Sequence, residues 1–152
     1  DHIIQSYPRL LEQTGGVIPA LASARQATAP HSTSSHYIAF VHIARARGRA
    51  LAGNHEGAVE DFREALDLNP DDPLALTQFA LSLHAMDQKA RAAEAFARSL
   101  GLDPGQVVPL VHLARYEIEQ GEERGARKFI EKCLELEPES DECRGLELSL
   151  SP

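Results

Sequence analysis

Three prolines divide the middle of the chain into intervals of equal length. Pro70, Pro104 and Pro138 lie 34 residues apart and close the tripeptides LNP, LDP and LEP. Chance rarely places prolines at equal intervals with a leucine and an acidic or amide residue before each. Such an interval is typical of proteins that stack one supersecondary unit several times, so the spacing predicts a repeat array.

The unit that ends at Pro104 has the apolar pattern of a helical hairpin. Apolar residues recur at helical spacing on both sides of a polar turn at Asp87 and Gln88, which predicts two amphipathic helices. A lone hairpin cannot bury such faces, so neighbouring hairpins are required. The apolar residues are Leu76, Phe79, Leu83 and Met86 before the turn, and Ala92, Phe96 and Leu100 after it.

This unit resembles a tetratricopeptide (TPR) repeat. The resemblance implies an all-α fold, a right-handed superhelical α-solenoid of antiparallel helix pairs. It places three repeats at residues 36–70, 71–104 and 105–138. The residues that carry the resemblance are Leu76, Phe79, Ala80, Leu83, Ala92, Phe96, Ser99 and Pro104, while Asp87 occupies a turn position that is usually glycine.

The remaining segments are expected to cover the ends of the array. Residues 1–30 are interpreted as a degenerate helical pair or an N-terminal cap. Residues 31–35 are interpreted as a connector in which Ser34 or Ser35 caps the next helix. Residues 139–152 are expected to form a C-terminal capping helix, because repeat arrays need a polar outer end.

The first helix of the first repeat fits two registers. Counting back the usual interval from Pro70 places Arg45 and Arg49 inward. Shortening the turn at Gly53-Asn54 by two residues points both arginines outward and leaves only Arg47 in an awkward position. Because burying an unpaired guanidinium costs several kcal/mol, the sequence favours the shortened turn. Its inward residues are Tyr37, Val41, Ala44, Gly48 and Leu51, with Gly48 at the small position of the repeat.

Charge and motifs exclude several classes of function. The chain has 15 Lys and Arg against 23 Asp and Glu, a net charge of −8, which argues against a nucleic-acid or anionic-membrane surface. Its apolar runs are too short to span a membrane. No nucleotide loop, nucleophile elbow, HExxH or CxxC motif is present, so no enzymatic activity is indicated.

Seven histidines and two cysteines are the candidates for a metal site and for a disulfide. His31, His36 and His42 are close in sequence, but no spacing of Cys or carboxylates supports them, and we expect no metal and no cofactor. Cys133 and Cys143 can meet where the capping helix packs on the last repeat. Buried free thiols are the commoner outcome and are expected here, whereas a bridge would indicate an oxidising compartment.

The resemblance also implies a binding groove lined by the first helix of each repeat. Its expected wall is apolar in the middle with Arg and His at the edges. It has no Lys or Asn at the positions where chaperone-binding TPR proteins clamp a C-terminal carboxylate. The expected groove residues are His42, Arg45 and Arg49 in the first repeat, Leu74, Thr77, Gln78, Leu81 and His84 in the second, and Val108, Val111, His112 and Arg115 in the third.

The leading hypothesis is therefore a non-catalytic scaffold that binds a peptide or helix carrying apolar and acidic groups. An alternative is a regulatory or substrate-positioning TPR domain of a larger, bacterial enzyme or assembly machine. Self-association into a homo-oligomer through the groove or the terminal helix is a third interpretation.

Overall fold

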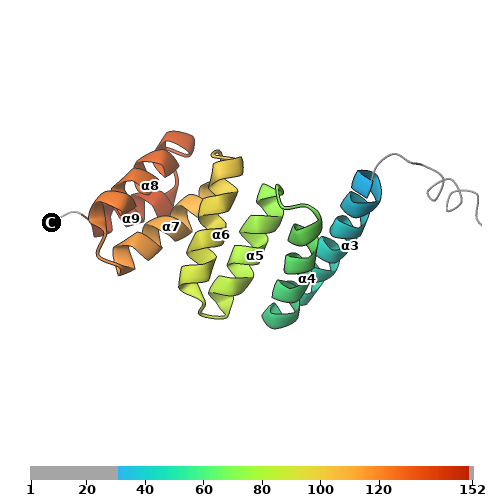
Figure 1. Ribbon diagram of the computed structural model, residues 1–152. Coiled ribbons are helices and arrows are strands. Elements are labelled where there is room, and N and C mark those ends of the chain that lie inside the picture. The colour runs from blue at the N-terminus through green and yellow to red at the C-terminus, as the bar shows by residue number, and fades with distance from the viewer. Residues whose placement is uncertain (1–30, 151–152) are drawn as a thin grey trace, which may run out of the picture. The chain divides into compact units, whose positions relative to one another are not determined.

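The computed structural model describes residues 31–150, and all regular structure within this part is helical. The N-terminal pair or cap expected at residues 1–30 lies outside the described residues. Figure 1 shows the described helices following one another side by side from α3 to α9. They are α3 (His31–Leu51), α4 (His55–Leu68), α5 (Pro73–Ala85), α6 (Lys89–Leu102), α7 (Val107–Glu119), α8 (Glu123–Leu136) and α9 (Asp141–Ser149).

The helices form antiparallel pairs, as expected for an α-solenoid, and this fold class is confirmed. From α4 onward each helix packs on the next along the chain, and α9 packs on both α7 and α8. None of the described helices combines the length and apolarity needed to cross a bilayer.

The turns within the pairs repeat one backbone conformation. Gly53, Asp87 and Gly121 lie 34 residues apart, and each has a positive φ, of 80°, 59° and 76° respectively. Glycine adopts this left-handed conformation without steric cost, and aspartate is among the few other residues that tolerate it. Asp87 therefore fills a glycine position without changing the turn.

The core is built from small and aromatic residues at equivalent places in successive pairs. Ala46, Ala80 and Ala114, each almost fully buried, occupy the first helices at the 34-residue interval. Their small side chains let the paired helices approach closely. The second helices contribute Ala58, Ala92 and Ala126, with the larger Phe62, Phe96 and Ile130 four residues after each.

The shortened register predicted for α3 is wrong. Ala46, which is 0% exposed, holds the small position, whereas Tyr37 and Leu51 are 69% and 90% exposed. A Cβ added at Gly48 would meet no atom within 4 Å, so this glycine does not mark a close helix contact. The prediction failed because it treated Arg45 and Arg49 as unpaired, and the structure supplies them with a partner, Asp61.

The connector expected at residues 31–35 is also not observed, because α3 is already helical from His31. Neither Ser34 nor Ser35 can then be the N-cap. Serine and threonine cost only about 0.5 kcal/mol each relative to alanine inside a helix, so a short run of them continues a helix that packing stabilises.

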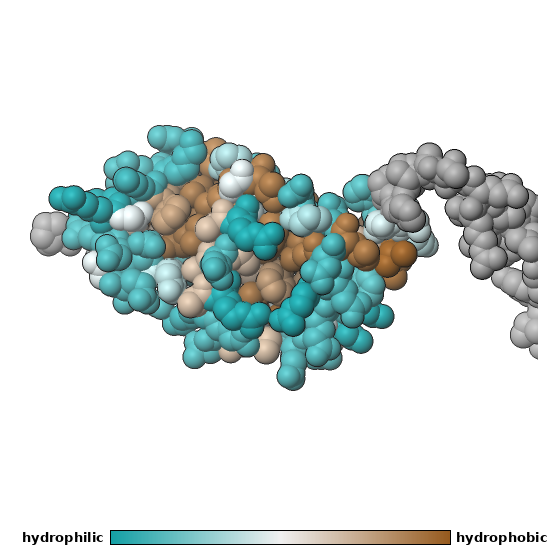
Figure 2. All heavy atoms as spheres, viewed as in Figure 1, coloured by the Kyte–Doolittle hydropathy of each residue, from teal (hydrophilic) through white to brown (hydrophobic). Residues whose placement is uncertain are grey.

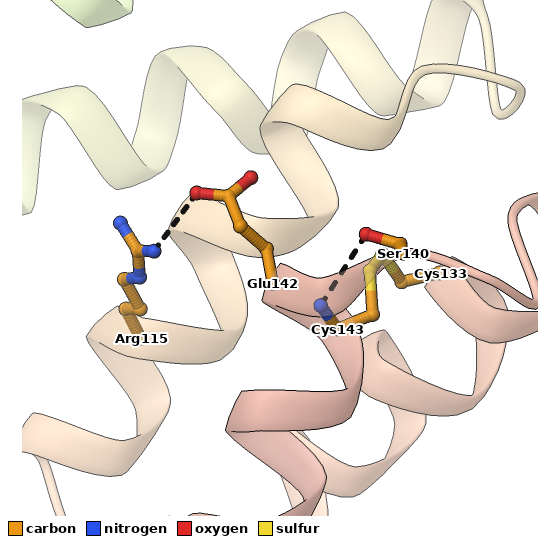
Figure 3. The surroundings of a disulfide bond; sticks show 5 residues. All are labelled: Arg115, Cys133, Ser140, Glu142 and Cys143. Atoms are coloured by element: carbon orange, nitrogen blue, oxygen red, sulfur yellow. Dashed lines mark hydrogen bonds and ion pairs between the residues drawn. A yellow bond between two sulfur atoms is a disulfide. The ribbon is translucent and has the colours of Figure 1, made fainter.

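The terminal helix α9 is tied to the array by a covalent bond and by polar contacts (Figure 3). Ser140 caps its first turn by accepting a hydrogen bond from the backbone N–H of Cys143 at 3.4 Å. Glu142 pairs with Arg115 of α7 at 3.1 Å. Cys133 of α8 and Cys143 are joined by a disulfide, with their Cα atoms 6.1 Å apart.

The expectation of free thiols is therefore wrong. The first turn of α9 packs directly on the inner face of α8, which brings both buried cysteines together. Their Cα separation lies within the range of about 4.4–6.8 Å that disulfides span.

Candidate functional site

A buried carboxylate organises the contact between α3 and α4. Asp61 of α4 is only 2% exposed. Arg45 donates to it through both Nε, at 2.9 Å, and Nη2, while Nη1 of Arg49 lies 2.9 Å from Oδ2. The hydrogen bond from Arg45 and the charges of the two arginines lower the pKa of Asp61 below its usual value, against the opposing effect of burial. Asp61 is thus ionised at neutral pH and holds α3 against α4.

This cluster occupies the residues that the sequence assigned to the groove of the first repeat. Arg45 and Arg49 are bound to Asp61, and His42 lies beside it, with Nδ1 3.2 Å from Glu64 Oε2. These three groove assignments were wrong, because they followed from the incorrect register of α3. The charged residue of α3 that lines a surface hollow, described below, is Arg47.

The same cluster offers three atoms that could serve as metal ligands. Single ligand atoms of His42, Asp61 and Glu64 lie within 4.8 Å of one another. However, both carboxylate oxygens of Asp61 already accept bonds from guanidinium groups. Two fixed cations beside a ligand oxygen repel a metal ion, so the cluster is better suited to join the helices.

A first hollow, of about 270 Å³, lies between α3, α4 and α5. Apolar side chains form much of its wall, and Leu51 and Leu81 are exposed at 90% and 37%. Arg47 contributes the positive charge. The lining residues are Arg47, Ala50, Leu51, His55, Phe62, Gln78, Leu81 and Ser82.

A second hollow, of about 210 Å³, lies on the other side of α5, between α5, α6 and α7. The ring of His112 stacks on Phe96, with centroids 4.7 Å apart, and His84 meets it edge-on at 4.9 Å. Burial, followed by the charges of His84 and Arg115, lowers the pKa of His112. The lining residues are His84, Lys89, Ala92, Ala93, Phe96, His112, Arg115, Tyr116 and Glu119.

Three of the residues that line the two hollows carry a buried polar atom that lacks a partner. In the described part of the chain, three buried side-chain atoms make no hydrogen bond: His55 Nδ1, Gln78 Oε1 and His112 Nδ1. His55 and Gln78 line the first hollow, and His112 lines the second. Buried polar groups are almost always hydrogen-bonded in folded proteins, so their concentration at these two places singles the hollows out.

The groove residues predicted on α5 and α7 divide into accessible and buried groups. Thr77 and Val111 are 8% and 3% exposed, and Thr77 bonds to Ser99 at 2.7 Å and to Gln106 at 2.8 Å. These two predictions were wrong, because both side chains are committed to packing between helices. The residues that line a hollow or are exposed are Leu74, Gln78, Leu81, His84, Val108, His112 and Arg115.

Sequence reasoning missed the members of the site that come from second helices and turns. Lys89, Ala92, Ala93 and Phe96 of α6 form one wall of the second hollow. The resemblance implies a groove lined by first helices alone, so these residues of a second helix were not predicted to line it. The acidic Asp61 next to Phe62 could have been found as a partner for two inward arginines.

Apolar residues also form part of the outer surface. Figure 2 shows them gathered in a band across the middle of the viewed face, between hydrophilic margins. The exposed large apolar residues include Phe40, Leu51, Leu74, Leu81 and Val108.

Comparisons with known proteins identify the repeats. Tetratricopeptide repeat models match residues 39–72 and 109–140. Tetratricopeptide repeat protein 34 of Mus musculus is 32% identical over 96 residues, which cover 60% of this chain. The match spans only 17% of that mouse relative.

Solved structures share the fold at low sequence identity. The Arabidopsis OM64 TPR domain superposes with a TM-score of 0.71 at 16% identity, covering 76% of this chain and 96% of that one. The first TPR of Spaghetti (RPAP3), bound to the HSP90 peptide SRMEEVD, gives 0.69 at 19% identity, covering 77% and 96%. The Sgt2 TPR domain from Aspergillus fumigatus gives 0.63 at 24% identity, covering 73% and 76%. The repeat matches, the mouse relative and the shared fold show that this chain is a tetratricopeptide repeat protein.

Proposed function

We propose that this chain is a non-catalytic protein-interaction module that holds a peptide or a short helix along α3, α5 and α7. Two structural neighbours were solved with peptides: the first TPR of Spaghetti (RPAP3) with SRMEEVD and the second TPR domain of human RPAP3 with SGPTIEEVD. They are 19% and 17% identical to this chain. The likeness establishes the fold, and peptide binding by this chain is our inference from its own surface.

The observation that carries the proposal is the pair of hollows that flank α5. Leu81 lines one hollow and His84, one helical turn further, lines the other, so a single extended segment crossing α5 would reach both. The linings include His55, Gln78 and His112, each of which has a buried side-chain atom without a hydrogen-bond partner among the described residues. A peptide backbone offers both N–H and C=O groups at short intervals, which is what such atoms require.

Apolar burial would supply most of the binding free energy. Four large apolar residues of the first helices are exposed. They are Leu51 of α3 and Leu81 of α5 at the first hollow, together with Leu74 of α5 and Val108 of α7. Covering a fully exposed leucine contributes roughly 1.5–3 kcal/mol. Leu51, at 90% exposure, is close to this case, whereas Leu81, at 37%, contributes a correspondingly smaller part.

The charges at the hollows favour a partner with acidic groups. Arg47, Lys89 and Arg115 line them, against the single acidic residue Glu119. Lys89 is paired with Glu119 and Arg115 with Glu142. The excess positive charge therefore comes from Arg47 at the first hollow, in contrast to the net charge of −8 for the whole chain. An acidic segment would thus be attracted to the hollows and repelled elsewhere, which raises the association rate and fixes orientation.

Selection of peptides from a displayed random library on the 152-residue chain tests the proposal. Selected peptides would be measured by fluorescence anisotropy against wild type, Leu81→Asp and Leu102→Asp. Leu102 is a matched control, since it is exposed to a similar degree, 44% against 37%, but lines neither hollow. We expect Leu81→Asp to weaken binding by at least about tenfold, equivalent to roughly 1.4 kcal/mol, and Leu102→Asp to leave it unchanged.

Two controls make the outcome interpretable. Far-UV circular dichroism verifies that both variants keep their helical content, and light scattering at two concentrations detects self-association of the chain. If both folded variants bind like wild type, or if Leu102→Asp alone weakens binding, the hollows around α5 are not the binding surface.

A further inference from the structure

The second hollow contains two histidines in contact at its wall. His112 of α7 lies flat on Phe96 of α6, with an interplanar angle of 13°, and His84 of α5 approaches it at 72°. Stacking on Phe96 fixes the plane of the His112 ring. Its buried Nδ1 makes no hydrogen bond to any described residue.

The charged groups around the histidine pair are already matched with one another. Lys89 of α6 bonds to Glu119 of α7 at 3.1 Å, and Arg115 of α7 bonds to Glu142 of α9 at 3.1 Å. Tyr116 of α7 is the remaining titratable residue of the lining. With each cation held by one carboxylate, a proton added to the histidine pair would give the hollow a net positive charge.

The free protein does not favour that proton. Burial lowers the pKa of His112, and the neighbouring His84 and Arg115 lower it further, while Glu142 acts in the opposite direction. A ligand that placed a negative charge beside the two histidines would reverse this preference, because it would favour the protonated ring of His112.

We propose that the second hollow binds an acidic side chain of the partner, with its carboxylate beside His84 and His112, and that binding takes up one proton. The methylene groups of a glutamate would pack on Ala92, Ala93 and Phe96, which form the apolar wall. The carboxylate accepts a hydrogen bond from a protonated ring nitrogen, and the proton comes from solvent. The inference rests on the proposed function, because the acidic side chain belongs to the segment held along α5.

Linkage sets the direction of the pH dependence. A carboxylate beside the pair favours the protonated ring, so binding raises the pKa of His112, and by reciprocity protonation strengthens binding. If the protonated form binds about tenfold more tightly, the pKa of His112 rises by about one unit at saturation. Affinity should consequently increase as the pH falls below neutral, through the pKa of His112 in the complex and toward its lowered pKa in the free chain.

The test is an NMR titration of the histidine rings in the full chain. The probe is N-acetyl-L-glutamate α-amide at about 100 mM, well above a millimolar Kd. The neutral isostere N-acetyl-L-glutamine amide is the matched control ligand. The exposed His36 of α3 serves as an internal reference in the same spectra. Resonances are assigned with His112→Phe, which keeps an aromatic ring on Phe96, and with His84→Gln.

We expect the glutamate probe to raise the pKa of His112 by at least half a unit and to leave His36 unchanged, with no response to the glutamine probe. No change in the pKa of His112, or an equal change with both probes, overturns the inference. The measurement on wild type is decisive even if a variant fails to fold.

Failure of this inference and failure of the proposed function can be told apart. If library peptides depend on Leu81 and yet bind equally at neutral and at acidic pH, with or without acidic residues, that outcome supports the interaction module and excludes the proton-linked acidic contact. A glutamate response at His112 without any selected peptide would support the acidic site and count against a peptide-binding module.

Discussion

Replacing Asp61 with alanine should loosen the contact between α3 and α4. Asp61 accepts three close contacts from the guanidinium groups of Arg45 and Arg49 and is almost fully buried. Removing a hydrogen-bonded carboxylate of this kind costs about 1.5–3 kcal/mol per well-formed charged bond, and leaving buried charge unpaired adds to it. Here both arginines are partly exposed, so water compensates part of the loss. We expect Asp61→Ala to lower the free energy of unfolding by about 2–3 kcal/mol.

Thermal unfolding followed by circular dichroism gives the first measurement. A loss of this size corresponds to a fall in Tm of roughly 10 °C for a domain of this length. Asp67→Ala is the matched control, because Asp67 is an exposed aspartate on the same helix. Repeat arrays open locally, so hydrogen exchange should show the lost protection concentrated in α3 and α4 and not in α7 and α8.

The pH dependence gives a second and independent measurement. The pKa of Asp61 is lower in the folded chain than in the unfolded chain, so its stabilising effect is complete above the unfolded value of about 3.9. That effect is lost as the pH falls through the folded value. The difference in stability between wild type and Asp61→Ala should stay constant from about pH 8 to pH 5 and shrink below about pH 4. Equal losses in Asp61→Ala and Asp67→Ala, or a difference that persists undiminished at low pH, would refute the ion-pair explanation.

Three further predictions concern packing, the disulfide and a buried polar network. Ala92→Leu should destabilise by roughly 1–3 kcal/mol through overpacking, whereas Ala90→Leu at an exposed position should change Tm little; equal Tm values would contradict the close helix contact. Cys133 and Cys143 should resist alkylation until a reductant is added, and reduction should cost about 2–3 kcal/mol; immediate alkylation of both would show free thiols. Thr77→Val should lower the free energy of unfolding by about 1 kcal/mol, because Thr77 is buried and hydrogen-bonded, and chemical denaturation without a change in midpoint would contradict this.

Much of the fold was predictable because a repeat imposes the same requirements at fixed intervals. The spacing of Pro70, Pro104 and Pro138 and the helical apolar pattern were sufficient to predict α4 to α8 and their pairing. Steric requirements of this kind are local and recur with the repeat. A recurring small residue indicates a close contact between helices, and a recurring turn glycine indicates a left-handed backbone conformation. Even Asp87, a departure from the pattern, retained the backbone conformation of the glycine it replaces.

The sequence left two registers for α3, and the tertiary structure decided between them. An inward arginine is unfavourable unless a carboxylate is placed against it, and Asp61 lies on a different helix, 16 residues beyond Arg45. Sequence periodicity shows which positions face inward, but it does not show which charges meet there. The same is true of Cys133 and Cys143, whose pairing depends on how the first turn of α9 lies on α8.

The sequence by itself thus determined the repeat architecture, whereas two of the groove positions it predicted on α5 and α7, Thr77 and Val111, are buried. Only the tertiary structure decided the shape and chemistry of the two hollows. Each hollow is formed by three helices from two successive pairs, so its walls combine residues that no single repeat pattern relates. Packing of neighbouring pairs therefore decides which buried polar atoms, such as His112 Nδ1, are left without a hydrogen-bond partner among the described residues.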